Sequence, residues 1–128
     1  MKPKREFRDD LQDIFETMDK VRRFVAGMSF EQFVEDDKTS FAVVRALEII
    51  GEATKHIPSS VRRKYPKVPW TRMAGMRDRL IHGYFGIDLE IVWETATRFI
   101  PELKPHIAHV LEGENPKGEA KVDDKESL

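Results

Sequence analysis

A short basic run that ends in a histidine and a tyrosine holds the residue types needed for phosphate and proton chemistry. The run Arg-Asp-Arg-Leu-Ile-His-Gly-Tyr spans positions 77–84. An imidazole changes protonation near neutral pH and can pass a proton. A guanidinium presents a planar fork of donors that fits a phosphate. Arg77 and His82 are therefore candidate catalytic residues for metal-independent RNA cleavage.

RNA cleavage of this kind uses the substrate's own 2′-hydroxyl as the nucleophile. A base removes its proton, an acid protonates the leaving 5′-oxygen, and a cation stabilises the phosphoryl charge. One histidine in one protonation state cannot be base and acid together. We therefore expect a symmetric homodimer that brings two copies of His82 and Arg77 to one cleft.

Helical geometry indicates how the residues around His82 are arranged. At about 100° per residue, Arg77 and Tyr84 share a stripe, whereas His82 lies about 140° around from Arg77. Arg77 is therefore expected to act across a cleft rather than beside the histidine of its own helix. Asp78 precedes His82 by four residues and is a third candidate catalytic residue, because a carboxylate there can orient the imidazole.

Each of these residues also has a purely structural interpretation. Arg77 can pair with Glu48 or Glu52 on a neighbouring helix. His82 can be a helix-terminal residue favoured by the helix dipole, and Tyr84 a buried aromatic with its hydroxyl at the surface. An arginine and a histidine at this spacing also occur by chance.

Composition places the chain among single-domain globular proteins. It has 128 residues, a net charge of −1, 40% hydrophobic and 35% charged residues, and no cysteine. Disulfides and cysteine-based zinc sites are excluded. No apolar run approaches the roughly 20 residues of a membrane span, and residues 1–10 lack the apolar core of a signal peptide. We expect a cytoplasmic protein with no cofactor.

Basic residues gather ahead of the motif. Seven lie between positions 62 and 79, against the single acid Asp78. Such a stretch attracts a polyanion locally, although a solvated helix face is the simpler interpretation. The candidate RNA-binding residues are Arg62, Arg63, Arg72 and Arg79.

A metal site is the weaker alternative. Glu102, His106 and His109 are spaced i, i+4 and i+7 on one helix face. Pro105 intervenes and no further ligand cluster is evident, so a solvated face is favoured and no metal is predicted.

Apolar periodicity predicts an all-α fold, an antiparallel bundle of four to five helices. The predicted helices cover about 7–28, a short piece after the capping box at Ser29, 39–57, a motif helix from 70, and a last helix from the N-cap Asp88 to about 110. In the third helix, the predicted buried face is Phe41, Val44, Leu47 and Ile50. Residues 1–112 form the predicted domain and 113–128 a disordered charged tail.

A longer run makes the motif specific. Residues 76–93 read Met-Arg-Asp-Arg-Leu-Ile-His-Gly-Tyr-Phe-Gly-Ile-Asp-Leu-Glu-Ile-Val-Trp. They closely resemble the HepT-like, DUF86 branch of the HEPN superfamily. The similarity extends upstream through Ala-Leu-Glu-Ile-Ile-Gly-Glu-Ala at 46–53, Ser-Val-Arg at 60–62 and Val-Pro-Trp at 68–70, and downstream through Pro-Glu-Leu at 101–103. It covers roughly residues 8–111.

The resemblance implies a homodimeric, metal-independent ribonuclease that acts as the toxin of a toxin–antitoxin pair. The family's catalytic arginine and histidine fall on Arg77 and His82, and the polar residue after the arginine falls on Asp78. The implied antitoxin is an MntA-like minimal nucleotidyltransferase, which transfers AMP to the motif's tyrosine, here Tyr84. The alternative is a non-catalytic helical dimer that serves as a binding or substrate subunit for that nucleotidyltransferase.

Overall fold

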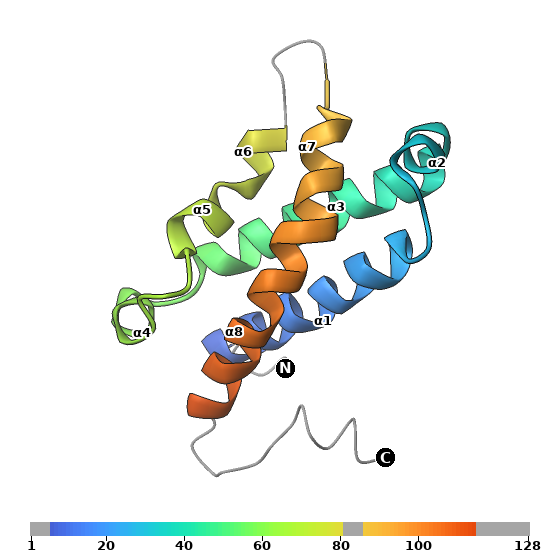
Figure 1. Ribbon diagram of the computed structural model, residues 1–128. Coiled ribbons are helices and arrows are strands. Elements are labelled where there is room, and N and C mark those ends of the chain that lie inside the picture. Colours follow the sequence, from blue (N-terminus) through green and yellow to red (C-terminus); the bar gives the residue numbers. More distant parts are fainter. Residues whose placement is uncertain (1–5, 81–85, 115–128) are drawn as a thin grey trace, which may run out of the picture.

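The computed structural model describes residues 6–80 and 86–114, and the elements of these residues are helices (Figure 1). The predicted all-α class is confirmed. The helices, in chain order, are α1 (Phe7–Val25), α2 (Phe30–Glu35), α3 (Asp37–Lys55), α4 (Ser59–Lys64), α5 (Trp70–Ala74), α6 (Met76–Leu80), α7 (Leu89–Glu94), the π-helix η2 (Thr95–Phe99) and α8 (Ile100–Gly113).

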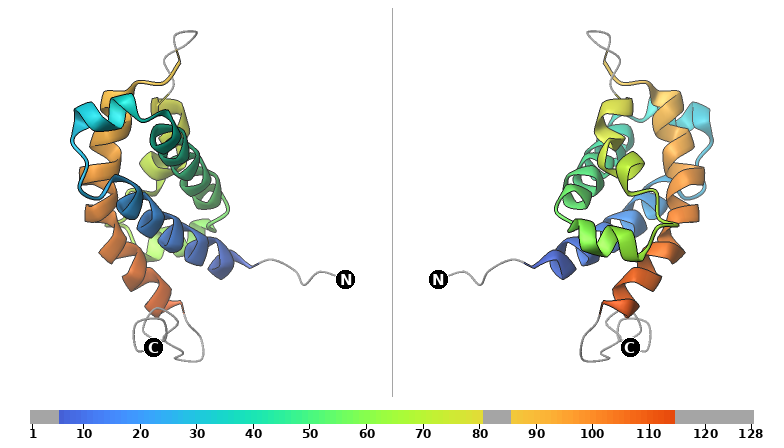
Figure 2. Two further views of the ribbon diagram at one scale, coloured as in Figure 1. Left: turned by 90° about the vertical axis from the view of Figure 1, so that its right-hand side faces the viewer. Right: turned by 90° about the vertical axis from the view of Figure 1, so that its left-hand side faces the viewer.

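The core lies between α1, α3 and the long rod formed by α7, η2 and α8. The rod crosses α1 and α3 on one side, while α5 and α6 cover α3 beside it (Figure 1). In both views of Figure 2, α3 lies at the edge of the body opposite α7 and α8. The apolar residues that recur along α1 at helical spacing face this core, and Leu11, Ile14, Met18 and Val21 are fully buried.

One predicted core residue is wrong. Phe41 in α3 is 76% exposed, whereas the sequence placed it on the buried face. The reason is geometric: three successive steps of three residues, from 41 to 50, turn the helix by about 900°, so Phe41 lies about 180° from Ile50. The buried stripe of α3 runs instead through Val43, Leu47 and Ile50.

Local capping signals define several helix ends. Ser29 accepts a hydrogen bond from the Gln32 N–H at 3.1 Å, and the Gln32 side chain accepts from the Ser29 N–H at 2.9 Å. This is the predicted capping box. Asp88 accepts from the Glu90 N–H at 3.0 Å, as expected of an N-cap.

The motif helix is divided. The sequence predicts one helix from Trp70, but the chain leaves helical geometry at Gly75 (φ −89°, ψ 9°) and restarts as α6. Gly51 explains how closely this region approaches α3. A Cβ atom at Gly51 would lie 3.3 Å from the Met73 carbonyl oxygen and 3.4 Å from that of Ala74. A glycine inside a helix is unfavourable without a packing reason, and this close approach supplies that reason.

The last helix changes type before its prolines. The Ile100 N–H donates to the Thr95 carbonyl, the five-residue step of a π-helix. Pro101 is the second residue of α8, directly after this π-helical turn, and Pro105 lies within α8. The helix is thus interrupted ahead of Pro101 rather than at Pro105.

A polar contact joins the end of α8 to α4. The carboxylate of Glu114 accepts hydrogen bonds from Lys64 Nζ and the Tyr65 hydroxyl, both at 2.8 Å. The Lys64 bond lowers the pKa of Glu114, and burial, with the nearby carboxylate, raises the pKa of Tyr65 to about 12. Most of the predicted tail, residues 115–128, lies outside the described residues.

Candidate active site

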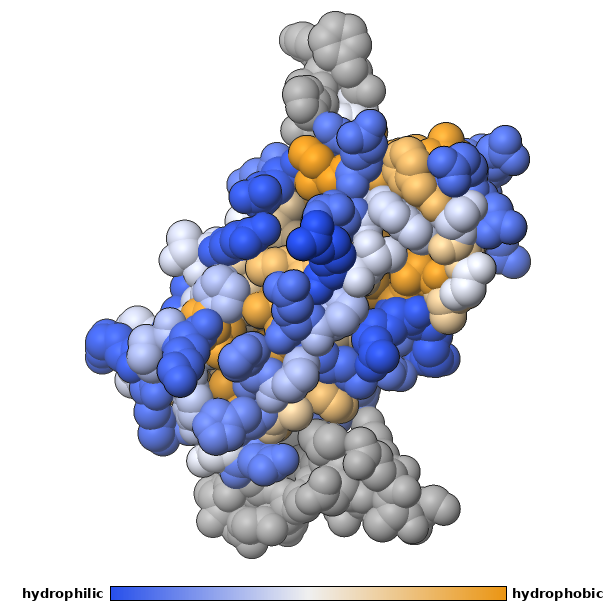
Figure 3. Space-filling model, viewed as in Figure 1, coloured by the Kyte–Doolittle hydropathy of each residue, from blue (hydrophilic) through white to orange (hydrophobic). Residues whose placement is uncertain are grey.

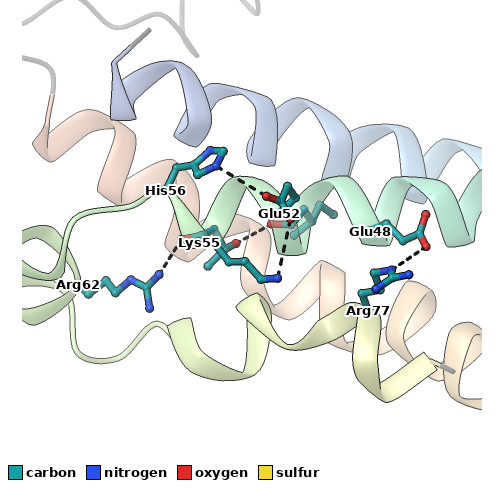
Figure 4. A network of polar contacts seen from close by, with 8 residues as sticks. Glu48, Glu52, Lys55, His56, Arg62 and Arg77 are labelled. Atoms are coloured by element: carbon teal, nitrogen blue, oxygen red, sulfur yellow. Dashed lines mark hydrogen bonds and ion pairs between the residues drawn. The ribbon is translucent and has the colours of Figure 1, made fainter.

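Arg77 stands on α6 with its guanidinium turned towards α3 (Figure 4). Its Nε donates to Glu48 Oε2 at 3.3 Å, while 61% of the Arg77 side chain remains exposed. The Glu48 pairing that sequence left as an alternative is therefore present. The pair is exposed enough to be worth little in stability, and a guanidinium has five N–H donors, of which this bond uses one.

Glu52, the other predicted partner of Arg77, points away from it. It lies one turn further along α3 and pairs with Lys55 at 3.8 Å and with His56 Nε2 at 3.8 Å (Figure 4). His56 Nδ1 also lies 3.2 Å from Oδ1 of Asp10, whose side chain is buried. This cluster ties the end of α3 to the start of α1 and stands apart from Arg77.

His82 and Tyr84 belong to residues 81–85, outside the described residues. Their predicted roles, and that of Asp78 in orienting His82, remain predictions. The flanks of the segment are defined, because the Asp88 N–H donates to the Leu80 carbonyl at 3.0 Å. The end of α6 and the residue before α7 are therefore in direct contact, and Arg77 lies three residues before this contact. Asp78 itself is exposed on α6.

Arg79 and Arg72 line a second feature, a groove of about 400 Å³ between α5–α6 and the α7–η2–α8 rod. The Arg72 guanidinium lies 4.1 Å from the centroid of the Phe99 ring, a cation–π contact. Acids share the walls: Glu90, Glu94 and Glu102 also line the groove. In Figure 3, strongly hydrophilic side chains stand on this face among paler and more hydrophobic patches.

The basic run does not form one patch. Arg62 and Arg63 lie on α4, at the far end of α5 from α6 (Figure 1). Arg62 donates to the carbonyl oxygens of Ile57 at 3.0 Å and Thr54 at 2.9 Å, so it caps the end of α3. Arg63 is exposed. Of the four candidate RNA-binding arginines, the fold brings together only Arg72 and Arg79.

The alternative metal ligands do not converge. Among residues 6–80 and 86–114, no three histidine or acidic side chains come close enough together to hold a metal ion. His109 instead packs edge-on against the Tyr65 ring, with centroids 5.9 Å apart. Within the same residues, no helix is both long and apolar enough to cross a bilayer.

Sequence reasoning missed two features of this region. The stacking of Arg72 on Phe99 joins residues 27 positions apart, and no local pattern marks it. The pairing of His56 with Asp10 spans 46 positions. The sequence held one signal for this pairing: Asp10 lies on the core face of an amphipathic helix, and a buried acid needs a partner.

Comparisons with known proteins agree with the motif. The sequence profile of the "Ribonuclease HepT-like" family matches residues 14–110. The chain is 46% identical over 117 residues to "Putative RNase MJ1216" of Methanocaldococcus jannaschii, covering 91% of this chain and 97% of that one. It is 50% identical over 101 residues to "Probable ribonuclease HepT" of Thermococcus cleftensis, covering 79% and 92%. No solved structure gives a significant match.

The protein is thus an all-helical domain whose relatives are named as ribonucleases. Since the family profile covers residues 14–110, the chain belongs to the HepT-like ribonuclease family.

Proposed function

We propose that this protein is a metal-independent endoribonuclease that uses Arg77 and His82, and that it acts as the toxin of a HepT/MntA-like pair. The observation that carries the proposal is Arg77 itself. Arg77 Nε bonds to Glu48, 61% of the Arg77 side chain is exposed, and the residue lies on α6 three positions before Leu80, after which the segment with His82 begins. Membership of a family named for ribonuclease activity supports the reaction class.

The chemistry balances without an external reactant. One imidazole takes the proton of the 2′-hydroxyl, and the 2′-oxygen attacks the adjacent phosphorus. The bond from phosphorus to the 5′-oxygen breaks, and that oxygen takes a proton from a second, protonated imidazole. The products are a 2′,3′-cyclic phosphate and a free 5′-hydroxyl. Arg77 stabilises the extra negative charge on the phosphoryl oxygens.

Two imidazoles imply two chains. Because each chain supplies one His82, the proposal includes a symmetric homodimer whose cleft holds both copies of His82 and Arg77. The Asp78 carboxylate holds the imidazole of His82, four residues further along the same chain, in a fixed orientation. Arg72 and Arg79 line the neighbouring groove and bind the flanking RNA.

Control by the antitoxin follows from the position of Tyr84 in the motif. A nucleotidyltransferase joins the α-phosphorus of ATP to the Tyr84 oxygen and releases pyrophosphate, while the hydroxyl proton goes to solvent. The added AMP carries a negative charge and bulk to the segment next to Arg77. It competes with the RNA phosphate for the guanidinium, which stops cleavage.

The test is cleavage of RNA by the purified chain in EDTA, beside His82→Ala. We expect fragments with 2′,3′-cyclic phosphate ends from the wild type alone, with both proteins equally folded. Equal cleavage by the two proteins would contradict the proposal. A folded, unmodified wild type without activity would do so as well.

One observation favours a competing function. Arg77 already has an acidic partner in Glu48, as expected of a structural arginine in a non-catalytic subunit of the nucleotidyltransferase. Tyr84→Phe separates the two. The toxin proposal expects the variant to remain active and to escape the antitoxin, whereas the subunit alternative expects loss of function.

A further inference from the structure

The groove between α5–α6 and the α7–η2–α8 rod, here called the Arg72 groove, begins at the contact between α6 and α7. Glu90, in the first turn of α7, lines one end of it. Asp88, two residues earlier, donates its N–H to the Leu80 carbonyl at 3.0 Å. A smaller cavity of about 10 Å³ shares part of the lining and reaches the buried Leu80. The segment with His82 starts directly after Leu80, so an RNA strand cleaved there has this groove within reach.

A row of charged side chains along the rod forms one wall of the Arg72 groove. Its members are spaced by four residues: Glu90, Glu94, Arg98 and Glu102. Residues four apart drift around an α-helix by about 40° per step. The wider π-helical turn of η2 takes up part of this drift, so the row stays on the groove. Single π-helical turns within longer helices are frequent at functional sites.

An arginine lying on an aromatic ring bridges the two walls. The Arg72 guanidinium lies 4.1 Å from the centroid of the Phe99 ring, and Arg72 is nevertheless an exposed residue. Unpaired RNA bases stack on guanidinium planes and aromatic rings of this kind. Bases within a duplex already stack on one another, so this surface favours a single-stranded nucleotide.

The charges suit a base better than a phosphate. Arg98 is paired with Glu94 at 2.7 Å, and Glu90 and Glu102 add two further carboxylates to the lining. Carboxylates repel a phosphate, but they accept hydrogen bonds from the N–H groups on the edge of a base. The groove therefore favours the uncharged base of a nucleotide over its backbone.

We propose that the Arg72 groove binds one unpaired guanine of the RNA substrate, stacked on Arg72 and recognised by the carboxylate of Glu102. Glu102 follows Phe99 by three residues, and side chains at this spacing are neighbours on a helix surface. Its carboxylate therefore stands beside the stack. Glu94 is already bonded to Arg98, and Glu90 lies about 18 Å away along the rod. The inference rests on the proposed function, because it names the RNA that the candidate active site takes.

The choice of guanine follows from its hydrogen-bond donors. A carboxylate offers two acceptor oxygens and no donor. The Watson–Crick edge of guanine places N1–H and the N2 amino group side by side, so one carboxylate accepts from both. Adenine and cytosine present one amino donor beside an acceptor nitrogen, and uracil presents one N–H between two carbonyl oxygens. Only guanine therefore pairs with both carboxylate oxygens without facing an acceptor.

The test measures binding of 2′-O-methyl octanucleotides, which the proposed reaction cannot cleave, by fluorescence anisotropy at one fixed salt concentration. The strands are all uridine except for one central guanine, inosine, adenine or uracil. Inosine keeps N1–H and lacks the N2 amino group. We expect the guanine strand to bind about tenfold more tightly than the adenine and uracil strands, as for a two-bond contact to a base, with inosine between them. Equal binding of all four strands, or of the guanine and inosine strands, would overturn the inference.

Glu102→Gln separates recognition of the base from general electrostatics. Removing a negative charge should leave binding of the uracil strand unchanged or tighter, whereas the preference for guanine should disappear. Glu112→Gln, at an exposed acid further along α8 and outside the groove lining, is the matched control and should keep the preference. Both positions are exposed, so both variants should fold normally, which circular dichroism checks. An undiminished preference in Glu102→Gln would overturn the role of Glu102.

Arg72→Lys keeps the charge and removes the planar stacking surface. All four strands should bind about fivefold more weakly, as for the loss of one stacked base. The dependence on salt should stay the same, because the number of positive charges is unchanged. Arg23→Lys, at an exposed arginine on α1 outside the groove, should bind like the wild type. Wild-type affinity in Arg72→Lys would overturn the stacking site.

Two further measurements distinguish the possible failures. Free GMP that binds as tightly as the guanine strand would overturn the inference in favour of a free nucleotide. Cleavage is measured separately on all-ribose guanine and uracil strands. A preference for guanine in binding without any cleavage would support the guanine site and refute the proposed function, whereas cleavage without a preference in binding would do the reverse. If both hold, the cut should move by one nucleotide when the guanine is moved by one.

Discussion

Gly51 offers a test of how the fold positions the candidate catalytic arginine. A Cβ atom there would meet the backbone oxygens of Met73 and Ala74 at 3.3 and 3.4 Å, and the Arg77 nitrogen at 3.8 Å. Gly51→Val adds two further methyl groups to the same space. Backbone atoms cannot rotate away as a side chain does, so α5 and α6 must move off α3.

The expected cost can be estimated. Overpacking a close contact costs about 1–3 kcal/mol, whereas replacing glycine by valine inside a helix returns only a few tenths of a kcal/mol in propensity, ~0.3. The net loss is about 2 kcal/mol. With a urea dependence of about 1–3 kcal/mol per molar, the unfolding midpoint should fall by roughly 1 M.

The assay is urea unfolding followed by tryptophan fluorescence, together with RNA cleavage under conditions where the variant is fully folded. We expect cleavage to fall as well, since displacing α6 moves Arg77. Gly75→Ala is the control: Gly75 has a negative φ, and its added Cβ would meet the Thr71 oxygen at an ordinary 3.5 Å. Unchanged stability of Gly51→Val would refute the close-approach argument.

Two further predictions concern charge. In Tyr84→Phe, Tyr65 is the only tyrosine, and absorbance at 295 nm should show it titrating at about 12. Because its folded pKa is raised above the ordinary value of 10, stability should fall as pH rises from 10 towards 12; titration near 10 would contradict this. Glu48→Gln should change stability by less than about 1 kcal/mol, as for a partly exposed pair, yet lower cleavage because Arg77 loses its anchor. Glu52→Gln, one turn along α3, should leave cleavage unchanged, and equal effects of the two variants would refute the role of Glu48.

Features decided by local chemistry were predictable from sequence. The capping residues Ser29 and Asp88 act within three positions of themselves, and the structure shows the expected bonds. The apolar stripe of α1 needed only the helical period. Gly51 was also informative, since an internal helix glycine is unfavourable without a packing reason.

Features decided by how helices meet were not predictable. Glu48 and Glu52 are equivalent acids by sequence, and only the rotation of α6 against α3 selects Glu48 as the partner of Arg77. The division at Gly75 depends on how α5 and α6 pack over α3. The exposure of Phe41 could have been predicted from the sequence, because residues spaced by three drift around a helix by about 60° per step.

The most direct test of the central claim compares two oligonucleotides of one sequence, all-ribose and 2′-O-methylated, incubated with the purified chain in EDTA. The account predicts that the wild type cleaves the ribose strand and leaves the methylated strand intact, because the methyl group blocks the 2′-oxygen nucleophile. It also predicts that His82→Ala cleaves neither strand. Cleavage of the methylated strand, or cleavage of the ribose strand by folded His82→Ala at the wild-type rate, would contradict the account.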